Sequence, residues 1–275
     1  MLKLLRRIFF AIYDFCYFYL ALLVFGISCL IWTVLVLITL PLIPRNKACP
    51  AARLAIMGGF RWYLLVLRLS GRMHFDLTEL DKIKNEKSLI IACNHPSLWD
   101  AVLTISRLPN AACIMKAQVI NNVFVGTGAR LARYIRNESP RDMIRRAVAE
   151  LQSGSQILLF PEGTRTVTPP INPLKSSLGV IATRAQVPVQ TVIIESDSNF
   201  LCKGWPPFRK PPLPMHWRVR LGRRFEPGDD SAALVAEIEQ YFASEILKSQ
   251  LSPTSAVFSR AASGTSHPAN ISETS

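Results

Sequence analysis

The run NHPSLWD at 94–100 brings a histidine and a carboxylate, His95 and Asp100, close together just after a short apolar stretch. In this arrangement Asp100 accepts a hydrogen bond from one imidazole nitrogen of His95 and fixes its tautomer. The other nitrogen is then a base for a substrate hydroxyl. Taken alone the pair is weakly specific, because a helix-capping aspartate beside a loop histidine gives the same pattern more often.

A second polar run, FPEGTR at 160–165, also follows a short apolar stretch. Gly163 permits an unusual backbone turn, and Arg165 offers a planar fork that suits a phosphate or a carboxylate. Open α/β sheets place their sites at strand ends, which is where both runs fall. By itself the run is equally compatible with a turn that carries a surface ion pair.

The elements that must position these runs alternate along the chain after Gly71, as short apolar stretches and amphipathic stretches. This alternation predicts an α/β domain with a mixed sheet flanked by helices. A helix begins at Pro140 behind the N-cap Ser139 and stops at Gly154. Strands are expected at 88–93, 111–116, 133–136, 156–160, 187–194 and 216–221, and further helices at 121–132, 174–185 and 232–247.

The N-terminal region is predicted to be membrane-embedded, because Asp14 is the only charged residue between Ile8 and Pro44. A straight helix of that length measures about 55 Å, whereas the hydrocarbon core of a bilayer is about 30 Å thick. We therefore expect one span with an interfacial extension, or a re-entrant hairpin that turns near 26–28. Basic residues on both flanks favour the hairpin, with both ends in the cytoplasm. A pair of buried core helices is the third alternative.

The predicted organisation has three parts: an N-terminal membrane segment at 1–48, a catalytic domain at 49–248 and a disordered tail at 249–275. The stretch 51–70 carries Arg53, Arg61 and Arg68 on one helical side. It is either an interfacial amphipathic helix or a core helix with a solvated arginine edge.

The formal net charge of +13 suits an anionic partner. The apolar N-terminus favours an anionic membrane surface, and the chain lacks a nucleic-acid-binding motif, so no nucleic acid partner is expected. The six cysteines form no CxxC pair and the histidines lack metal-ligand spacing. Neither a metal site nor a cofactor is predicted.

Together and in this order, the two polar runs resemble the blocks of the phospholipid/glycerol acyltransferase superfamily, the PlsC-like or 1-acyl-sn-glycerol-3-phosphate acyltransferase family. Asn94, His95 and Asp100 match its NHxxxxD block, and 160–165 match its FPEGTR block in full. The resemblance covers roughly 83–225. It implies that His95 is the general base and that Asp100 orients it. It also implies that Lys116 helps to stabilise the oxyanion and that the acceptor binds to Glu162, Gly163, Thr164 and Arg165.

Two departures from the family pattern bear on the acceptor. The second block normally ends in an arginine, but Asn137 stands there and Arg136 comes one position early. The fourth block keeps Pro188 and has Thr191 near its second proline position. Arg136 and Lys175 are the basic residues expected to replace the missing arginine. An acceptor other than lysophosphatidate, such as an aryl-polyene or another specialised lipid, is therefore the alternative.

The resemblance implies a membrane-bound O-acyltransferase of phospholipid biosynthesis. It would move a fatty-acyl group from an acyl carrier protein or coenzyme A thioester to a hydroxyl of a lysophospholipid or similar glycerolipid. The expected location is the bacterial inner membrane, with the catalytic domain facing the cytoplasm. The alternative of another class is a non-catalytic membrane lipid-binding protein, which would not need the His95 and Asp100 pair.

Overall fold

The structure is a computed structural model, and it describes residues 2–39, 44–206 and 208–249 of the 275. Its centre is a seven-stranded sheet in the order β1-β7-β6-β2-β5-β3-β4. Neighbouring strands are parallel except β6 and β7, so the sheet is mixed, as predicted. The strands are β1 Met73–Asp76, β2 Leu89–Cys93, β3 Ala111–Met115, β4 Ile135–Arg136, β5 Gln156–Leu159, β6 Val189–Ser196 and β7 Met215–Phe225.

The central strands β2, β5 and β6 are buried along their whole lengths. The apolar runs at 89–93, 157–159 and 192–194 fit strands that are covered on both faces, and this is why the sequence predicted them. The sequence did not predict β1, because only Met73 of its four residues is buried and His74 and Asp76 are exposed. An edge strand of this kind carries little hydrophobic signal.

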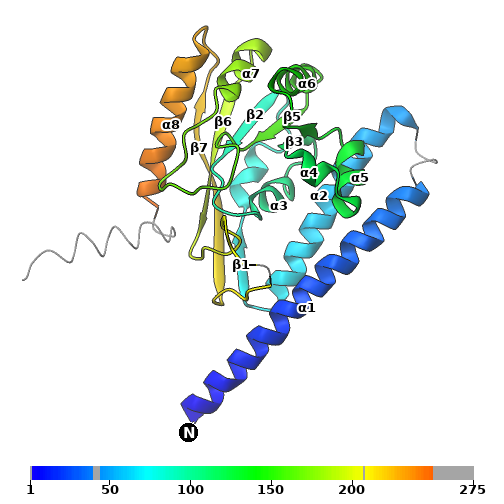
Figure 1. The fold of residues 1–275 in the computed structure, drawn as a ribbon, viewed down its shortest axis with the longest axis vertical. Coiled ribbons are helices and arrows are strands. Elements are labelled where there is room, and N and C mark those ends of the chain that lie inside the picture. The colour runs from blue at the N-terminus through cyan, green and yellow to red at the C-terminus, as the bar shows by residue number, and fades with distance from the viewer. Residues whose placement is uncertain (1, 40–43, 207, 250–275) are drawn as a thin grey trace, which may run out of the picture.

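Two groups of helices flank the sheet (Figure 1). In the first group α2 packs against α3 and α5, and α1 lies beside α5. In the second group α7 packs between α6 and α8. The predicted helix after Ser139 is confirmed, since the Ser139 hydroxyl accepts a hydrogen bond from the Asp142 amide. The helices are α1 Leu2–Thr39, α2 Arg45–Leu69, α3 Asp100–Ile105, α4 Ala117–Ile120, α5 Val123–Leu131, α6 Pro140–Gln152, α7 Ser177–Ala185 and α8 Ser231–Leu247, with a 3-10 turn, η2, at Thr78–Lys82.

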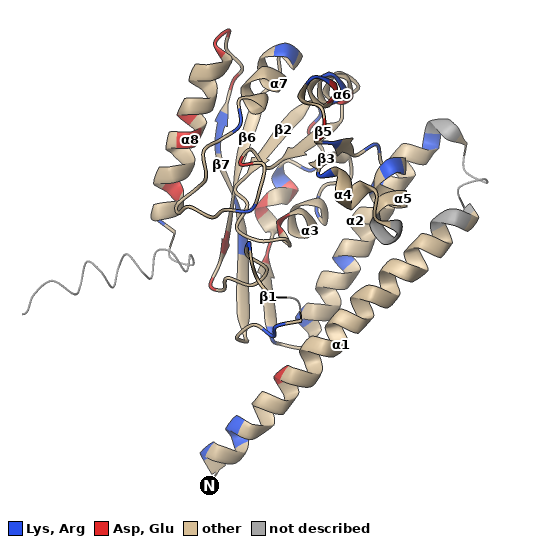
Figure 2. Ribbon diagram, viewed as in Figure 1, with Lys and Arg blue, Asp and Glu red and all other residues tan. Residues whose placement is uncertain are grey.

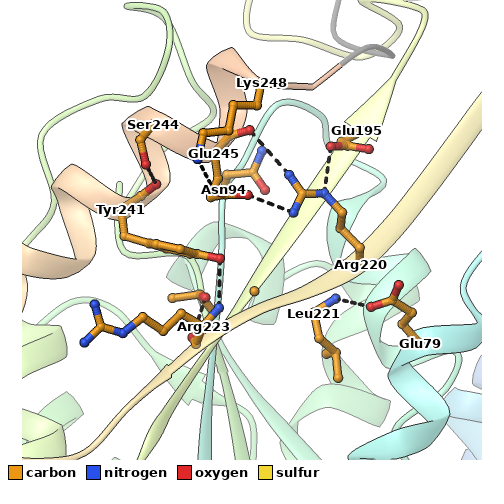
Figure 3. Close-up of polar contacts among 12 residues, drawn as sticks. Glu79, Asn94, Glu195, Arg220, Leu221, Arg223, Tyr241, Ser244, Glu245 and Lys248 are labelled. Atoms are coloured by element: carbon orange, nitrogen blue, oxygen red, sulfur yellow. Dashed lines mark hydrogen bonds and ion pairs between the residues drawn. The ribbon is translucent and has the colours of Figure 1, made fainter.

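A partly buried arginine ties α8 to the sheet (Figure 3). Arg220 on β7 donates to Glu195 on β6 at 2.9 Å and to Glu245 on α8 at 3.2 Å. The carboxylates come from two elements far apart in the sequence, so the guanidinium fixes β6, β7 and α8 as one unit.

Helix α1 is continuous from Leu2 to Thr39, so the predicted turn near 26–28 is wrong. The chain instead reverses between α1 and α2, which run antiparallel: Tyr13 bonds to Ser70 and Tyr17 to Leu67. In the described residues, α1 is the one helix long and apolar enough to cross a membrane. Figure 2 shows its middle and C-terminal parts without charge.

The single acid of α1 has a partner in the catalytic domain. Arg72 donates to both carboxylate oxygens of Asp14, at 2.5 and 2.8 Å, and also to the Leu213 carbonyl. The Asp14 residue is only 7% exposed. An acid in this apolar run is therefore explained by an ion pair that binds α1 to the start of the sheet.

The arginines of α2 do not share one environment, contrary to the expectation from their spacing. Arg53 is 3% exposed, whereas Arg61 and Arg68 are exposed. The Arg53 guanidinium donates to the Ala132 carbonyl, to Glu150 and to two further side-chain oxygens, those of Asn110 and Ser155. Its partners lie far along the chain, so the sequence did not reveal this core anchor. Of the predicted tail, all but Ser249 lies outside the described residues.

Arg53→Ala is expected to lower the free energy of unfolding by about 3 kcal/mol, because it removes the main cationic partner of the largely buried Glu150. Arg61→Ala, on the exposed side of the same helix, should change it by less than about 0.5 kcal/mol. Chemical unfolding of the detergent-solubilised protein measures both. The double variant Arg53→Met/Glu150→Gln should regain much of the loss. Equal stability of Arg53→Ala and Arg61→Ala would contradict the anchoring role.

Candidate active site

Asn94 fixes the loop that follows β2. Its side-chain amide donates to the Ile194 carbonyl at 3.0 Å, and its side-chain oxygen accepts from the Ile194 amide at 2.7 Å. The residue is 4% exposed. Two reciprocal bonds to β6 replace the strand pairing that ends at Cys93, so the next residue, His95, leaves the sheet at a defined point.

His95 and Asp100 form the predicted pair. The Nδ1 atom of His95 lies 2.8 Å from Oδ2 of Asp100, and the same oxygen accepts a hydrogen bond from the Ser97 amide. Asp100 is fully buried as the first residue of α3. The His95 ring stacks on Phe160, with centroids 4.1 Å apart. With Nδ1 donating to the carboxylate, Nε2 is the free base.

Burial raises the pKa of Asp100, while the hydrogen bond and charge of His95 and the charge of Arg165 act in the opposite direction. Within the described residues, Oδ1 of Asp100 has no hydrogen-bond partner. The negative charge is therefore balanced mainly through His95. A proton taken up on Nε2 would create an imidazolium next to a carboxylate that is already buried and oriented.

The family pattern implies that Glu162 binds the acceptor, but the Glu162 side chain is not exposed to a ligand. It is 2% exposed, and its oxygens accept from the His95 amide at 2.8 Å, from the Thr166 hydroxyl at 2.9 Å and from the Asn172 amide at 3.0 Å. Burial raises the pKa of Glu162, and these hydrogen bonds act in the opposite direction. The Thr166 amide donates in turn to the His95 carbonyl at 2.8 Å. Glu162 and Thr166 thus brace the backbone of His95 through its amide and its carbonyl.

Gly163 and Lys175 lie against each other beyond this brace. Gly163 has φ +70, a conformation that favours glycine, and a Cβ atom there would meet Lys175 Cε at 3.5 Å. The Lys175 amide donates to the Pro161 carbonyl at 2.8 Å, which holds the lysine beside the run. Thr164 is partly exposed. Gly163, Thr164 and Lys175 are therefore brought together, as a site for one ligand requires.

Arg165 reaches across to the loop that follows β6. Its Nη1 donates to the carbonyls of Leu201 and Cys202, each at 2.9 Å. Within the described residues, its Nε and Nη2 groups make no hydrogen bond. The side chain is partly exposed and contributes charge near Asp100. Nη1 thus holds this loop, while Nε and Nη2 are not used in it.

Lys116 and Arg136 sit at the ends of the neighbouring strands β3 and β4. Lys116 is exposed and precedes α4. Arg136 pairs with Glu138 at 3.7 Å and bonds to Asn121. Among the described residues, no hydrogen bond or ion pair joins either one to His95. Their sheet positions are at the same strand-end edge, but their roles stay predictions.

Comparisons with known proteins find similarity to acyltransferases. Residues 74–195, which include both polar runs, match the family model described as Acyltransferase. A 1-acyl-sn-glycerol-3-phosphate acyltransferase of Pseudomonas aeruginosa is 21% identical over 79% of this chain and 84% of its own. A putative 1-acyl-sn-glycerol-3-phosphate acyltransferase, acl-2, of Caenorhabditis elegans is 26% identical over 48% of this chain and 49% of its own.

A solved structure shows the same fold. The 1-acyl-sn-glycerophosphate (LPA) acyltransferase PlsC of Thermotoga maritima superposes with a TM-score of 0.60. The superposition covers 86% of this chain and 94% of that one, at 21% sequence identity. The fold similarity therefore extends beyond residues 74–195, which the family model matches.

Glu162→Gln is expected to slow acyl transfer at least tenfold in kcat with little change in the acceptor KM. A glutamine amide group would oppose one of the three donors around position 162 and release the His95 backbone. Glu239→Gln is the matched control, because Glu239 also accepts a backbone amide, that of Leu174 at 2.7 Å. Steady-state kinetics of the folded variants test this role of Glu162. A raised acceptor KM with a normal kcat would instead make Glu162 an acceptor-binding residue.

Proposed function

Because residues 74–195 are an acyltransferase domain of the PlsC-like superfamily, we propose that this chain is a membrane-bound O-acyltransferase with His95 as its general base. The substrates are a fatty-acyl thioester of acyl carrier protein or coenzyme A and a hydroxyl of a lysophospholipid or similar glycerolipid. The observation that carries the proposal is the 2.8 Å contact between His95 Nδ1 and buried Asp100 at the end of β2.

The reaction follows from the orientation of His95. Nε2 takes the proton of the acceptor hydroxyl as its oxygen forms a bond to the thioester carbonyl carbon. Asp100 stabilises the imidazolium that results. When the tetrahedral intermediate collapses, the carbon–sulfur bond breaks and the leaving thiolate receives the proton from His95. Lys116, at the end of β3, is proposed to stabilise the negative charge on the carbonyl oxygen.

The acceptor's anionic group is proposed to bind at Arg165 and Lys175, beside Gly163 and Thr164. The free edge of the Arg165 guanidinium provides charge-assisted hydrogen bonds. Arg136 is the further basic residue that the family pattern suggests. Its ion pair with Glu138 and the presence of Asn137 in place of an arginine favour a second candidate, an acceptor other than lysophosphatidate such as an aryl-polyene or other specialised lipid.

Helix α1 supports a membrane location. Its contacts with the rest of the protein extend from Phe10, whose ring lies under the Arg72 guanidinium, to Trp32, which lies against Gly128. This is about 30 Å of helix. Beyond the cations Lys3, Arg6 and Arg7, most of its exposed side chains are apolar. We infer that this surface lies in the lipid of the bacterial inner membrane and that the catalytic domain faces the cytoplasm. A non-catalytic lipid-binding protein would have no use for an oriented base.

His95→Ala should reduce acyl transfer by at least 100-fold while the protein remains folded and bound to membranes, since general-base catalysis is worth about that much. Asp100→Asn should be severely impaired as well, because an amide can hold the wrong tautomer. His216→Ala is the control: His216 also contacts an aspartate, Asp197, at 2.7 Å, but on β7, beside the edge strand β1. More than a tenth of wild-type turnover in purified His95→Ala would exclude the general-base role.

Arg165→Ala should lower kcat/KM by about 10- to 150-fold with an anionic acceptor, the range for a lost charge-assisted bond. Arg165→Lys should recover only part, because an ammonium lacks the planar fork. Assays with lysophosphatidate and with uncharged monoacylglycerol separate the two functions of this residue. An equal loss with both acceptors would mean that Arg165 only holds the Leu201 loop.

Lipid analysis of cells that lack the gene, compared with complemented cells, identifies the acceptor class. A missing phosphatidate-derived product supports the glycerolipid acceptor, and a missing specialised lipid supports the second candidate.

A further inference from the structure

We propose that the loop between β6 and β7 docks on an anionic phospholipid surface, through Phe208 and the cations Lys203 and Arg209. The inference rests on the proposed membrane location and extends it. It assigns a second contact with the bilayer, beside that of α1, and places this contact against the candidate active site.

The composition of this loop is that of a membrane interface. Phe208 is 74% exposed, and Lys203 and Arg209 are exposed. The Arg209 guanidinium lies over the Trp205 ring, 5.3 Å from its centroid, and the indole N–H donates to the Arg209 carbonyl at 3.1 Å. The sequence has no acid between Asp197 and Glu226. Aromatic rings with nearby cations suit the headgroup region of an anionic bilayer.

The position of the loop makes a bilayer the fitting occupant. The Tyr19 hydroxyl of α1 donates to the Phe208 carbonyl at 3.1 Å, and the rings of Phe18 and Phe200 meet edge to face at 5.9 Å. Beside Tyr19, α1 exposes Leu20 and Leu23, each 59% exposed. Phe208 therefore continues an apolar surface that begins on α1. A lipid phase covers both at once, whereas a soluble acidic partner would cover the cations alone.

The same loop is bonded to the candidate catalytic loops. The Leu201 carbonyl accepts from the Leu98 amide at 3.1 Å and from Arg165 at 2.9 Å. The Ser97 hydroxyl donates to the Phe200 carbonyl at 2.9 Å. Leu98 is itself 56% exposed. Docking of the loop would thus bring the residues that flank His95 against the lipid in which an amphiphilic acceptor is dissolved.

Photo-crosslinking tests the contact directly in the full chain. The photoreactive residue p-benzoylphenylalanine replaces Phe208, and the protein is reconstituted into vesicles of phosphatidylcholine with or without phosphatidylglycerol. The matched control is the same residue in place of Leu247, which is 50% exposed on α8, on the far side of the sheet from α1 (Figure 1). We expect lipid adducts at 208, more of them with phosphatidylglycerol, and few at 247. Equal labelling at 208 and 247, or crosslinks from 208 to added acyl carrier protein instead of lipid, would overturn the proposal.

A kinetic comparison tests the consequence for catalysis. The variant Lys203→Gln/Phe208→Ser/Arg209→Gln should lose about tenfold in rate with acceptor embedded in anionic vesicles. It should keep its rate with a short-chain acceptor in detergent, which also shows that it is folded. Leu247→Ser should be unchanged in both assays. Equal loss in vesicles and in detergent would refute the docking role. Failure of the proposed acyltransferase function would instead appear as absence of activity in the wild type, and the crosslinking result would still stand on its own.

Discussion

The site depends on the hydrogen bonds that join the loop after β2 to the loop after β5. The backbone of His95 donates to Glu162 at 2.8 Å and accepts from the Thr166 amide at the same distance. The two loops meet because β2 and β5 are parallel neighbours, which end at the same edge of the sheet. Without this brace, the imidazole would rest on Asp100 and the Phe160 ring alone. The two polar runs of the sequence are therefore parts of one positioning device.

Two buried acids carry this arrangement, and each is stabilised differently. Glu162 is surrounded by three donors, which offset the desolvation that raises its pKa. Asp100 uses one oxygen for two donors, and its other oxygen has no partner among the described residues. A carboxylate held in this way gains from a positive charge on His95, which suits a base that becomes protonated during a reaction. The fully bonded Glu162 suits a structural support instead.

Local pattern predicted much of the fold, and long-range contacts account for what it missed. The six predicted strands are present, and the helix after Ser139 begins and ends where its capping residues indicated. The pairing of His95 with Asp100 was also predictable, since both lie in one short run. The anchoring of Arg53 by Glu150 was not, nor was the bracing by Glu162, because each joins residues far apart in the chain. The continuity of α1 depends on packing against α2 and α5, which hydropathy alone does not encode.

The exposed residues around His95 support the proposal that the candidate site faces the same lipid surface as α1. Leu98 follows the histidine in its loop and Val167 follows the run 160–165, and they are 56% and 57% exposed. Large exposed apolar side chains on the two loops that carry His95 and Glu162 fit a surface that contacts lipid. An acceptor with an acyl chain leaves the bilayer only at the cost of exposing that chain. In the proposed arrangement, a base beside the lipid surface would avoid that cost, because the acceptor headgroup would reach His95 while its chain stays in the membrane.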